Sequence, residues 1–217
     1  MAFDPILLKN WKLAIANYLA YMFTGIIECI GEVVTIEKIG TNLRFLINSP
    51  ILKELKIDQS VSHNGVCLTI ESLAENGHWI TAIEETLLKT DLISWIEGKQ
   101  INLERCMLMN GRIDGHIVQG HVDITAVCVE KKELDGSWEF SFQFPKEYAH
   151  LVIEKGSIAI NGTSLTCFNV ERDRFSVAII PYTYDNTNIH QVDLGTEVNI
   201  EFDILGKYVQ RRMELME

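Results

Sequence analysis

The feature that most constrains the fold of this chain is an internal repeat. Residues 64–69 read Asn-Gly-Val-Cys-Leu-Thr and return 97 positions later, at residues 161–166, as Asn-Gly-Thr-Ser-Leu-Thr. Over residues 60–104 the same shift gives eleven identical positions without a gap, where unrelated sequences would share about two or three. Outside the motif the identical pairs are Ser60 with Ser157, Ile83 with Ile180, Thr86 with Thr183, Thr90 with Thr187, Gly98 with Gly195, Asn102 with Asn199 and Glu104 with Glu201. The chain is therefore two copies of one module.

The two copies differ at one reactive position, where Cys67 in the first copy becomes Ser164 in the second. A free cysteine is most often a small buried hydrophobe, and an Asn-Gly pair is by itself a turn signal. These interpretations stay open, but a polar group at the matched position favours a shared pocket wall. Twin modules with different reactive groups predict two similar pockets for two similar ligands.

The composition favours a two-domain globular protein that acts on a small molecule. A chain of 217 residues can hold two domains of about 100 residues, and 47% hydrophobic with 23% charged residues is typical of globular proteins. The net charge of −11 argues against a nucleic-acid partner. No apolar run reaches 18 residues, which argues against a membrane span. The five cysteines show no CxxC or zinc spacing, so we expect free thiols, no metal and a cytoplasmic location.

Both modules have the pattern of short β-strands separated by turns. Residues 138–144 and 198–204 alternate apolar and polar side chains, which is typical of half-buried strands. Ser49-Pro50 and Pro145 each predict the start of one short helix. Many short strands with small helices favour a small closed or Greek-key barrel in each module.

The two ends of the chain lie outside this barrel pattern. Residues 1–21 are interpreted as an extension ahead of the first domain, because their order of charged and apolar residues is wrong for a signal peptide. Near the C-terminus an apolar stripe predicts a helix that docks either on its own domain or on another subunit. The stripe consists of Ile204, Leu205, Tyr208, Val209, Met213 and Met216.

Two histidines are candidates for acid–base chemistry. His116 and His121 are five residues apart, which on a strand places them on opposite faces, so they are not expected to share a metal ion. A histidine near a reactive centre is the natural proton shuttle at neutral pH. A purely structural role is the other interpretation for each histidine.

Several ordered motifs resemble riboflavin synthase of the alpha-chain type. They are Met-Phe-Thr-Gly-Ile-Ile at residues 22–27, Ser-Val-Ser-His-Asn-Gly-Val-Cys-Leu-Thr at 60–69, Gly-His-Ile-Val-Gln-Gly-His-Val at 115–122, Asn-Gly-Thr-Ser-Leu-Thr at 161–166 and Ile-Pro-Tyr-Thr at 180–183. The resemblance covers residues 22 to about 208. No single motif is specific, but the ordered set is.

The resemblance implies an all-β fold of two tandem, homologous, six-stranded Greek-key β-barrels with short helices, followed by a C-terminal α-helix. The expected parts are an N-terminal extension (1–21), two lumazine-binding barrels (22–113 and 114–203) and a trimerisation helix (204–217). The resemblance also implies a homotrimer, with the active site between the N-barrel of one subunit and the C-barrel of another, and association with lumazine synthase. No cofactor and no metal are implied.

The implied reaction is the dismutation of two 6,7-dimethyl-8-ribityllumazine molecules by transfer of a four-carbon unit. The products are riboflavin and 5-amino-6-ribitylamino-2,4-pyrimidinedione. Two identical substrates fit two duplicated pockets, and holding both together removes much of the entropic barrier to a bimolecular step.

The resemblance assigns residues to both pockets. The first pocket would be lined by Gly25, Ile26, Ile27, Cys67, Leu68, Thr69 and a strand formed by Thr81, Ala82, Ile83, Glu84, Glu85 and Thr86. The second would use Gly120, His121, Val122, Lys155, Asn161, Ser164, Leu165, Thr166 and a strand formed by Ala178, Ile179, Ile180, Pro181, Tyr182 and Thr183. Asn161 stands where some family members have aspartate, so no charged role follows for it.

The resemblance also implies roles for five catalytic residues and for Thr166. His121 would assist removal of a proton from the 7-methyl group of one lumazine. Ser60 and Cys67 would activate or hold the nucleophile that adds to the ring. Ser164 and Thr166 would orient the ring in the second pocket, and Asp203 would form a hydrogen bond in the junction.

Two rival functions share some of these features. A non-catalytic lumazine- or flavin-binding antenna protein has the same two barrels, but such relatives lack reactive side chains of the kind present at Cys67, His121 and Ser164. A chymotrypsin-like cysteine protease also has two barrels. Its nucleophile is followed by glycine, whereas Cys67 is followed by Leu68. The sequence therefore favours the synthase.

Overall fold

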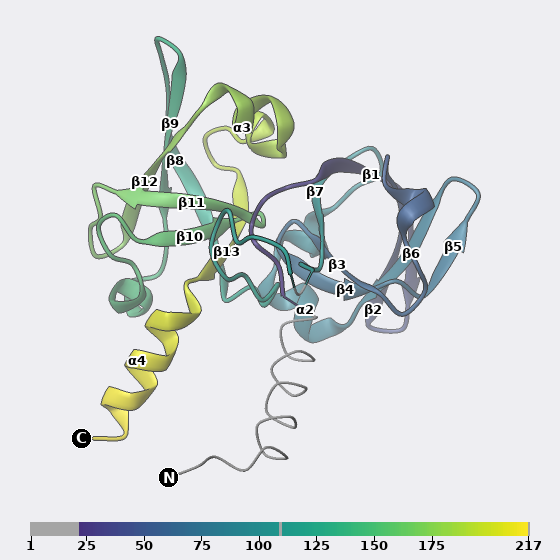
Figure 1. The fold of residues 1–217 in the computed structure, drawn as a ribbon, viewed down its shortest axis with the longest axis horizontal. Coiled ribbons are helices and arrows are strands. Elements are labelled where there is room, and N and C mark those ends of the chain that lie inside the picture. Colours follow the sequence, from purple (N-terminus) through teal and green to yellow (C-terminus); the bar gives the residue numbers. More distant parts are fainter. Residues whose placement is uncertain (1–21, 109, 217) are drawn as a thin grey trace.

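The computed structural model describes residues 22–108 and 110–216. It contains two β-rich modules side by side, with α4 (Ile204–Glu214) extending away from the second module (Figure 1). The predicted class, two β repeats followed by a C-terminal helix, is confirmed. In the described part of the chain no helix is long and apolar enough to cross a membrane. The predicted extension, residues 1–21, lies outside the described residues.

The first module forms a seven-stranded antiparallel sheet rather than the six strands predicted. In sheet order the strands are β4 (Val66–Thr69), β3 (Ser60–His63), β7 (Gln100–Arg105), β1 (Cys29–Ile39), β2 (Asn42–Asn48), β6 (Gly77–Ala82) and β5 (Ser72–Ala74). The count differs because Ile70 and Glu71 interrupt one strand and leave β4 and β5 as separate pieces. The path itself continues, since Glu71 N donates to Trp79 O on β6 at 2.9 Å.

The second module is the predicted closed barrel of six strands. Around the barrel they are β10 (Ser157–Ile160), β11 (Thr163–Phe168), β12 (Arg174–Ile179), β9 (Ser137–Gln143), β8 (Ile124–Leu134) and β13 (Glu197–Phe202). Here β11 is continuous and pairs with both β10 and β12. The strand that is interrupted between β4 and β5 in the first module is therefore continuous as β11 in the second module, where it closes the barrel.

Short helices connect the strands, and the sequence analysis predicted the positions of only some of them. They are η1 (Leu52–Glu54), α2 (Glu84–Lys89), η2 (Asp91–Ser94), η3 (Lys146–Leu151), α3 (Pro181–Asn186) and η4 (Asn188–Gln191). The helix predicted at Ser49-Pro50 is only a 3₁₀ turn that begins after Ile51. Pro145 is the residue before its helix rather than the first helical residue.

The strands predicted over residues 81–86 and 178–183 are wrong in their second halves. They end at Ala82 and Ile179, and α2 and α3 follow. Pro181 begins α3, where its fixed φ suits the first helical position. Glu84, Glu85, Tyr182 and Thr183 therefore lie on helices.

The alternating strands bury their apolar face, and β13 buries its polar face as well. Phe140 and Phe142 on β9 are fully buried in the second core, as their spacing predicts. On β13, however, the polar Asn199 and Glu201 are also buried, with 1% and 3% exposure. Their side of the strand faces the junction with the first module rather than solvent, so period-two patterning alone could not locate them.

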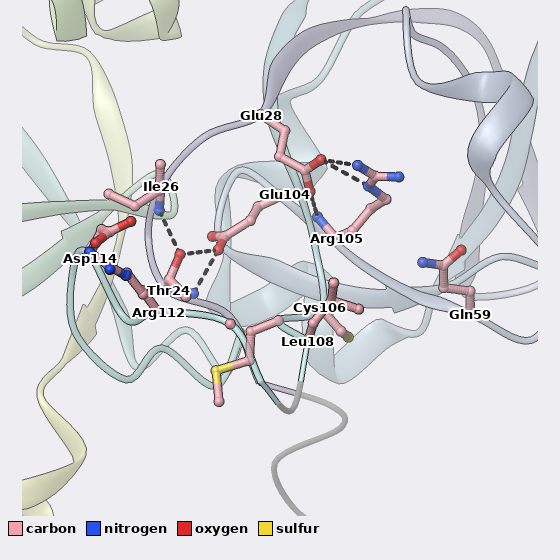
Figure 2. A pocket seen from close by; sticks show the side chains of 12 residues that line it. Thr24, Ile26, Glu28, Gln59, Glu104, Arg105, Cys106, Leu108, Arg112 and Asp114 are labelled. Atoms are coloured by element: carbon pink, nitrogen blue, oxygen red, sulfur yellow. Dashed lines mark hydrogen bonds and ion pairs between the residues drawn. The ribbon is translucent and has the colours of Figure 1, made fainter.

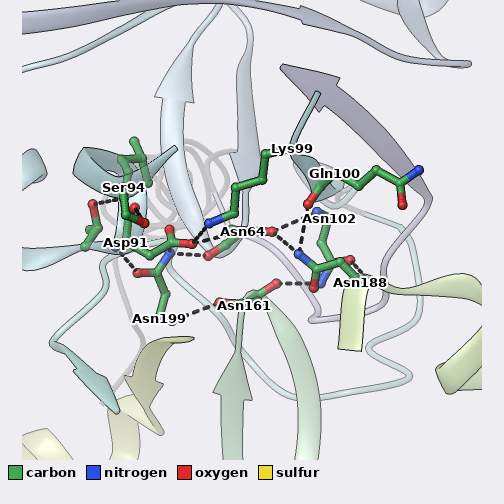
Figure 3. Close-up of polar contacts among 11 residues, drawn as sticks. Asn64, Asp91, Ser94, Lys99, Gln100, Asn102, Asn161, Asn188 and Asn199 are labelled. Carbon is green, nitrogen blue, oxygen red and sulfur yellow. Dashed lines mark hydrogen bonds and ion pairs between the residues drawn. The ribbon is translucent and has the colours of Figure 1, made fainter. Parts of the chain in front are cut away.

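An amide network joins the modules where the two Asn-Gly turns meet (Figure 3). Asn64 Oδ1 accepts from Asn102 N at 2.8 Å, and Asn161 Oδ1 accepts from Asn199 N at 2.9 Å. The network then crosses the junction: Asn102 Nδ2 donates to Asn161 O and Asn199 Nδ2 donates to Asn64 O, each at 2.9 Å. The repeated asparagines therefore hold one module against the other.

Close backbone contact at this junction explains the repeated glycines. Gly65 and Gly162 have φ of +82° and +78°, and a Cβ on Gly65 would lie 2.7 Å from Gly162 N. A side chain at either position would force the two turns apart. The Asn-Gly pairs thus serve both as turns and as the contact between modules.

The C-terminal helix confirms the predicted stripe and leaves it largely uncovered. Asp203 Oδ1 caps the helix by accepting from Leu205 N at 3.0 Å, and Lys207 pairs with Asp123 at 2.6 Å. Leu205, Tyr208 and Val209 are each more than 60% exposed. The stripe therefore does not dock along its own module.

Candidate active site

The candidate site lies at two equivalent contacts, in each of which a loop from the start of one module meets the reactive strand of the other module. Gly120 O accepts from Cys67 N at 2.8 Å, and Gly25 O accepts from Ser164 N at 2.8 Å. A Cβ on Gly120 would lie 2.6 Å from Cys67 Cβ, and a Cβ on Gly25 would lie 2.6 Å from Ser164 Cβ. Only glycine permits this approach.

This exchange of loops differs from the predicted grouping at Gly25 and Gly120. The sequence grouped residues 25–27 with Cys67 and residues 120–122 with Ser164, following the order of the chain. In the structure the loop that contains Gly25 lies against Ser164, and the loop that contains Gly120 lies against Cys67. Sequence order assigns each loop to the module it precedes, and nothing in that order reveals a crossing.

A cavity of about 220 Å³ lies beside Cys67. Its lining includes six predicted site residues and three that the sequence did not assign. They are Cys67, Glu85, Thr86, Gly120, His121 and Val122, together with Val66, Lys89 and Thr90. Of the three missed, Thr90 carried a signal, because it recurs as Thr187. Leu68 packs into the core and Thr69 is exposed.

Cys67 is a protonated thiol in this setting. Burial raises its pKa above the ordinary value, and a hydrogen bond with the side chain of Ser60 opposes that shift only in part. The negative charge of Glu201 raises the pKa further. A thiol of this kind donates a hydrogen bond and is a poor thiolate nucleophile at neutral pH.

Ser164 is paired with His116 rather than with His121. His116 Nδ1 lies 2.7 Å from Ser164 Oγ, and His116 is 9% exposed. Burial lowers the pKa of His116, although the charge of Asp203 opposes this, so its imidazole is neutral near pH 7. His116 was a candidate from the sequence but was not among the predicted site residues. The spacing of the two histidines does not show which of them lies beside Ser164.

The two histidines do have different environments, as predicted, but not for the predicted reason. His116 is buried and His121 is exposed. The segment between them is no regular strand and forms one isolated bridge, from Val118 to Phe23. The loop bends to place each histidine beside a different module.

Other predicted residues of the second pocket are more scattered. Ile180 and Tyr182 are 59% and 74% exposed. Lys155 is also exposed and places Nζ 5.8 Å from the centre of the Phe168 ring. Asn161 belongs to the junction network rather than to an open pocket.

A larger cavity, of about 430 Å³, lies on the first module beside the loop of residues 22–28 (Figure 2). Thr24, Glu104 and Arg105 contribute to its lining. Glu104 accepts hydrogen bonds from Thr24 N at 2.6 Å, Thr24 Oγ1 at 2.7 Å and Gly25 N at 3.0 Å. Burial raises the pKa of Glu104 to about 7 despite these donors.

Comparison with known proteins first defines the class. A model of the lumazine-binding domain matches the chain twice, over residues 24–106 and 119–203. These ranges coincide with the two modules, so the chain is a protein with tandem lumazine-binding domains.

Whole-chain relatives then narrow the class. Riboflavin synthase of Actinobacillus pleuropneumoniae is 38% identical over 191 residues, which is 88% of this chain and 89% of that one. Riboflavin synthase of Bacillus subtilis is 36% identical over 191 residues, with the same coverage of 88% and 89%. That of Saccharomyces cerevisiae is 36% identical over 207 residues, covering 89% and 87%. The chain belongs to the riboflavin synthase family, as its motifs predicted.

Solved structures show the same fold at greater distance. LumP complexed with 6,7-dimethyl-8-(1'-D-ribityl) lumazine has a TM-score of 0.76 and 21% identity, covering 83% of this chain and 98% of that one. LumP complexed with riboflavin gives a TM-score of 0.77 at the same identity and coverage. At this identity the likeness concerns the arrangement of the two modules.

Proposed function

We propose that this protein is a riboflavin synthase, an enzyme that transfers a four-carbon unit between two molecules of 6,7-dimethyl-8-ribityllumazine. The products are riboflavin and 5-amino-6-ribitylamino-2,4-pyrimidinedione. The observation that carries this proposal is the pair of crossed contacts, in which Cys67 and Ser164 meet equivalent loops. One framework built twice suits two copies of one substrate, and different polar walls suit a donor and an acceptor.

In the pocket beside Cys67 the protein would manage protons and hydrogen bonds. His121 is exposed and lines the same cavity as Cys67, so it can accept a proton from the 7-methyl group of a bound lumazine. Ser60 and the protonated Cys67 thiol hold the group that adds to the ring through hydrogen bonds. No cofactor or metal takes part in this scheme.

In the second pocket the protein would orient the other lumazine. Ser164 and Thr166 present hydroxyl groups to the ring, and the neutral His116 fixes the Ser164 hydroxyl through their 2.7 Å contact. Asp203, which caps α4 by accepting from Leu205 N, would form a hydrogen bond in the junction. Fixing both rings before reaction removes much of the entropic cost of bringing them together.

The complete site would form between subunits of a homotrimer. The exposed stripe of α4, including Leu205, Tyr208 and Val209, offers an apolar face for such an assembly. The pocket beside Cys67 of one subunit would then meet the pocket beside Ser164 of another. Association with lumazine synthase and a cytoplasmic location belong to the same proposal.

The test is turnover without any added cofactor. Purified protein is mixed with 6,7-dimethyl-8-ribityllumazine, and riboflavin is followed by absorbance. Catalytic formation of one riboflavin for every two lumazines consumed establishes the synthase. Tight binding without turnover would instead indicate an antenna protein, and neither binding nor turnover would overturn the proposal. Analytical ultracentrifugation of the same sample checks for the trimer.

A further inference from the structure

Two buried glutamates occupy matching positions on the last strand of each module. Glu104 lies on β7 and Glu201 lies on β13, and each is 3% exposed. Burying a carboxylate is costly unless donors surround it. The donors of both glutamates belong to the two loops that cross between the modules.

Glu201 binds the loop that completes the Cys67 pocket. Its Oε1 accepts from Gln119 N at 2.6 Å, and its Oε2 accepts from His121 N at 2.8 Å. Gly120, between these two residues, turns its carbonyl oxygen to Cys67 N. The carboxylate thus fixes both sides of Gly120, which reaches into the first module.

Glu104 binds the loop that meets Ser164. Its two oxygens accept from the backbone N–H groups of Thr24 and Gly25, and Figure 2 shows the contacts with Thr24. The carbonyl oxygen of Gly25 then accepts from Ser164 N, in the second module. The first amide donor, Thr24 or Gln119, precedes the loop glycine in both arrangements. The second donor differs, because Glu104 binds the amide of Gly25 itself and Glu201 binds that of His121, which follows Gly120. Glu104 also gains a donor from the Thr24 hydroxyl.

We propose that Glu201 and Glu104 are positioning residues, each of which holds the loop that completes the pocket of the opposite module. Glu201, on the second module, shapes the Cys67 pocket, and Glu104, on the first, shapes the Ser164 pocket. Neither needs to touch substrate. The effect on catalysis rests on the proposed function, whereas the effect on the loops does not.

A carboxylate satisfies this geometry. The loops present backbone N–H donors and, at Glu104, the Thr24 hydroxyl, and a carboxylate offers two acceptor oxygens and no hydrogen. Glutamine would turn an N–H₂ group toward one of the loop amides, so that two donors face each other. Glutamine has nearly the same size, so Glu201→Gln and Glu104→Gln change the hydrogen bonding while leaving the packing volume intact.

The first experiment measures backbone hydrogen exchange without any ligand. In Glu201→Gln the Cys67 amide, which donates to the released loop, should exchange at least about tenfold faster. This factor is the equivalent of one lost hydrogen bond. The Ser164 amide should keep its wild-type rate. Glu104→Gln should give the reverse pattern. Glu197→Gln, an exposed glutamate at the start of the same strand as Glu201, is the matched control and should change neither amide.

The crossed pattern is what a merely structural role would not produce. Equal acceleration of both amides in both variants would overturn the proposal, as would wild-type exchange throughout. This outcome does not depend on the ligand, so it stays decisive even if the wild-type protein fails to bind lumazine.

The second experiment separates binding from chemistry. Lumazine titration of Glu201→Gln should show roughly tenfold weaker binding at one of two sites, with the other site unchanged, and Glu104→Gln should weaken the other site. In steady state the variants should raise KM more than they lower kcat. A fall in kcat alone, with both affinities intact, would contradict a positioning role.

Discussion

The two modules share one backbone plan but differ in the polarity of their interiors. In the first module His63 and His78 are fully buried, and their Nε2 atoms lie 2.9 Å apart. The repeat places Ile160 and Phe175 at the same positions of the second module, where both belong to the apolar core. Duplication has preserved the crossed loops and let the cores diverge.

The histidine pair gives the first module a sensitivity that the second lacks. Val61 O accepts from His63 Nδ1 at 2.9 Å, so His63 Nε2 is the acceptor of the hydrogen bond that His78 Nε2–H donates. His78 Nδ1 is then a buried acceptor with no hydrogen-bond partner among the described residues. Both imidazoles must be neutral, since neither can gain a proton without a charge in the core.

The reactive position provides the largest expected difference between the pockets. Cys67→Ala should lower kcat by about a thousandfold, because it removes a hydrogen-bond donor at the reacting ring, while the affinity for lumazine changes by only a few fold. Cys67→Ser makes the first pocket resemble the second and keeps a donor, so it should stay within about tenfold of wild type. Steady-state rates and lumazine titration measure both effects, and an unchanged rate for Cys67→Ala would rule out a catalytic Cys67.

Acid should destabilise the first module selectively. Burial lowers the pKa of His78 to about 4, and that of His63 also lies well below 6.5. Because the unfolded state takes up protons from about pH 6.5 downward while the folded core does not, stability present above pH 6.5 is lost as the pH falls to 4. His78 alone accounts for about 3 kcal/mol of this loss.

Urea unfolding at pH 7 and pH 4, followed by tryptophan fluorescence, measures this effect. The double variant His63→Ile with His78→Phe, which copies the second module, should lose much less stability between the two pH values. A variant that loses as much stability as wild type would show that other groups govern the acid response.

The sequence predicted the fold more fully than it predicted the site. Identity at a fixed shift established two modules, and alternation placed Phe140 and Phe142 in a core. Strand ends were wrong just after Ile83 and Ile180, because an isoleucine with extended backbone can either continue a strand or precede a helix. The local sequence pattern does not decide between a continuing strand and the start of a helix.

The contacts between each loop and the opposite module could not be predicted from the sequence pattern. Gly25 and Gly120 appeared beside the modules that they precede, yet each completes the other module's pocket. Glu104 and Glu201 were visible as a repeated pair, but buried carboxylates are rare, so an exposed position is the ordinary expectation for glutamate. Spatial neighbours far apart in the chain require coordinates.

The smallest expected effect concerns the charge in the junction network, where the modules again differ. Asp91 is buried and accepts from Lys99 Nζ at 3.0 Å and Asn199 Nδ2 at 2.8 Å, whereas the repeat places Asn188 and Thr196 at the positions of Asp91 and Lys99. Asp91→Asn should cost about 1 kcal/mol of unfolding free energy. Lys99→Thr should cost more, roughly 2 kcal/mol after allowing for its partial exposure, because it leaves a buried carboxylate unpaired.

A double-mutant cycle makes this comparison sharper. Once Asp91 is Asn, the loss of Lys99 no longer leaves a buried charge, so the Asp91→Asn, Lys99→Thr double variant should be more stable than the sum of the single losses predicts. Its junction would have the same residue pair as the second module. Additive losses in urea unfolding would show that Lys99 is held by solvent and by the Trp95 ring, 5.9 Å from its Nζ, rather than by Asp91. In that case the charge at Asp91 would be compensated by the amide donors of Asn64 and Asn199 alone.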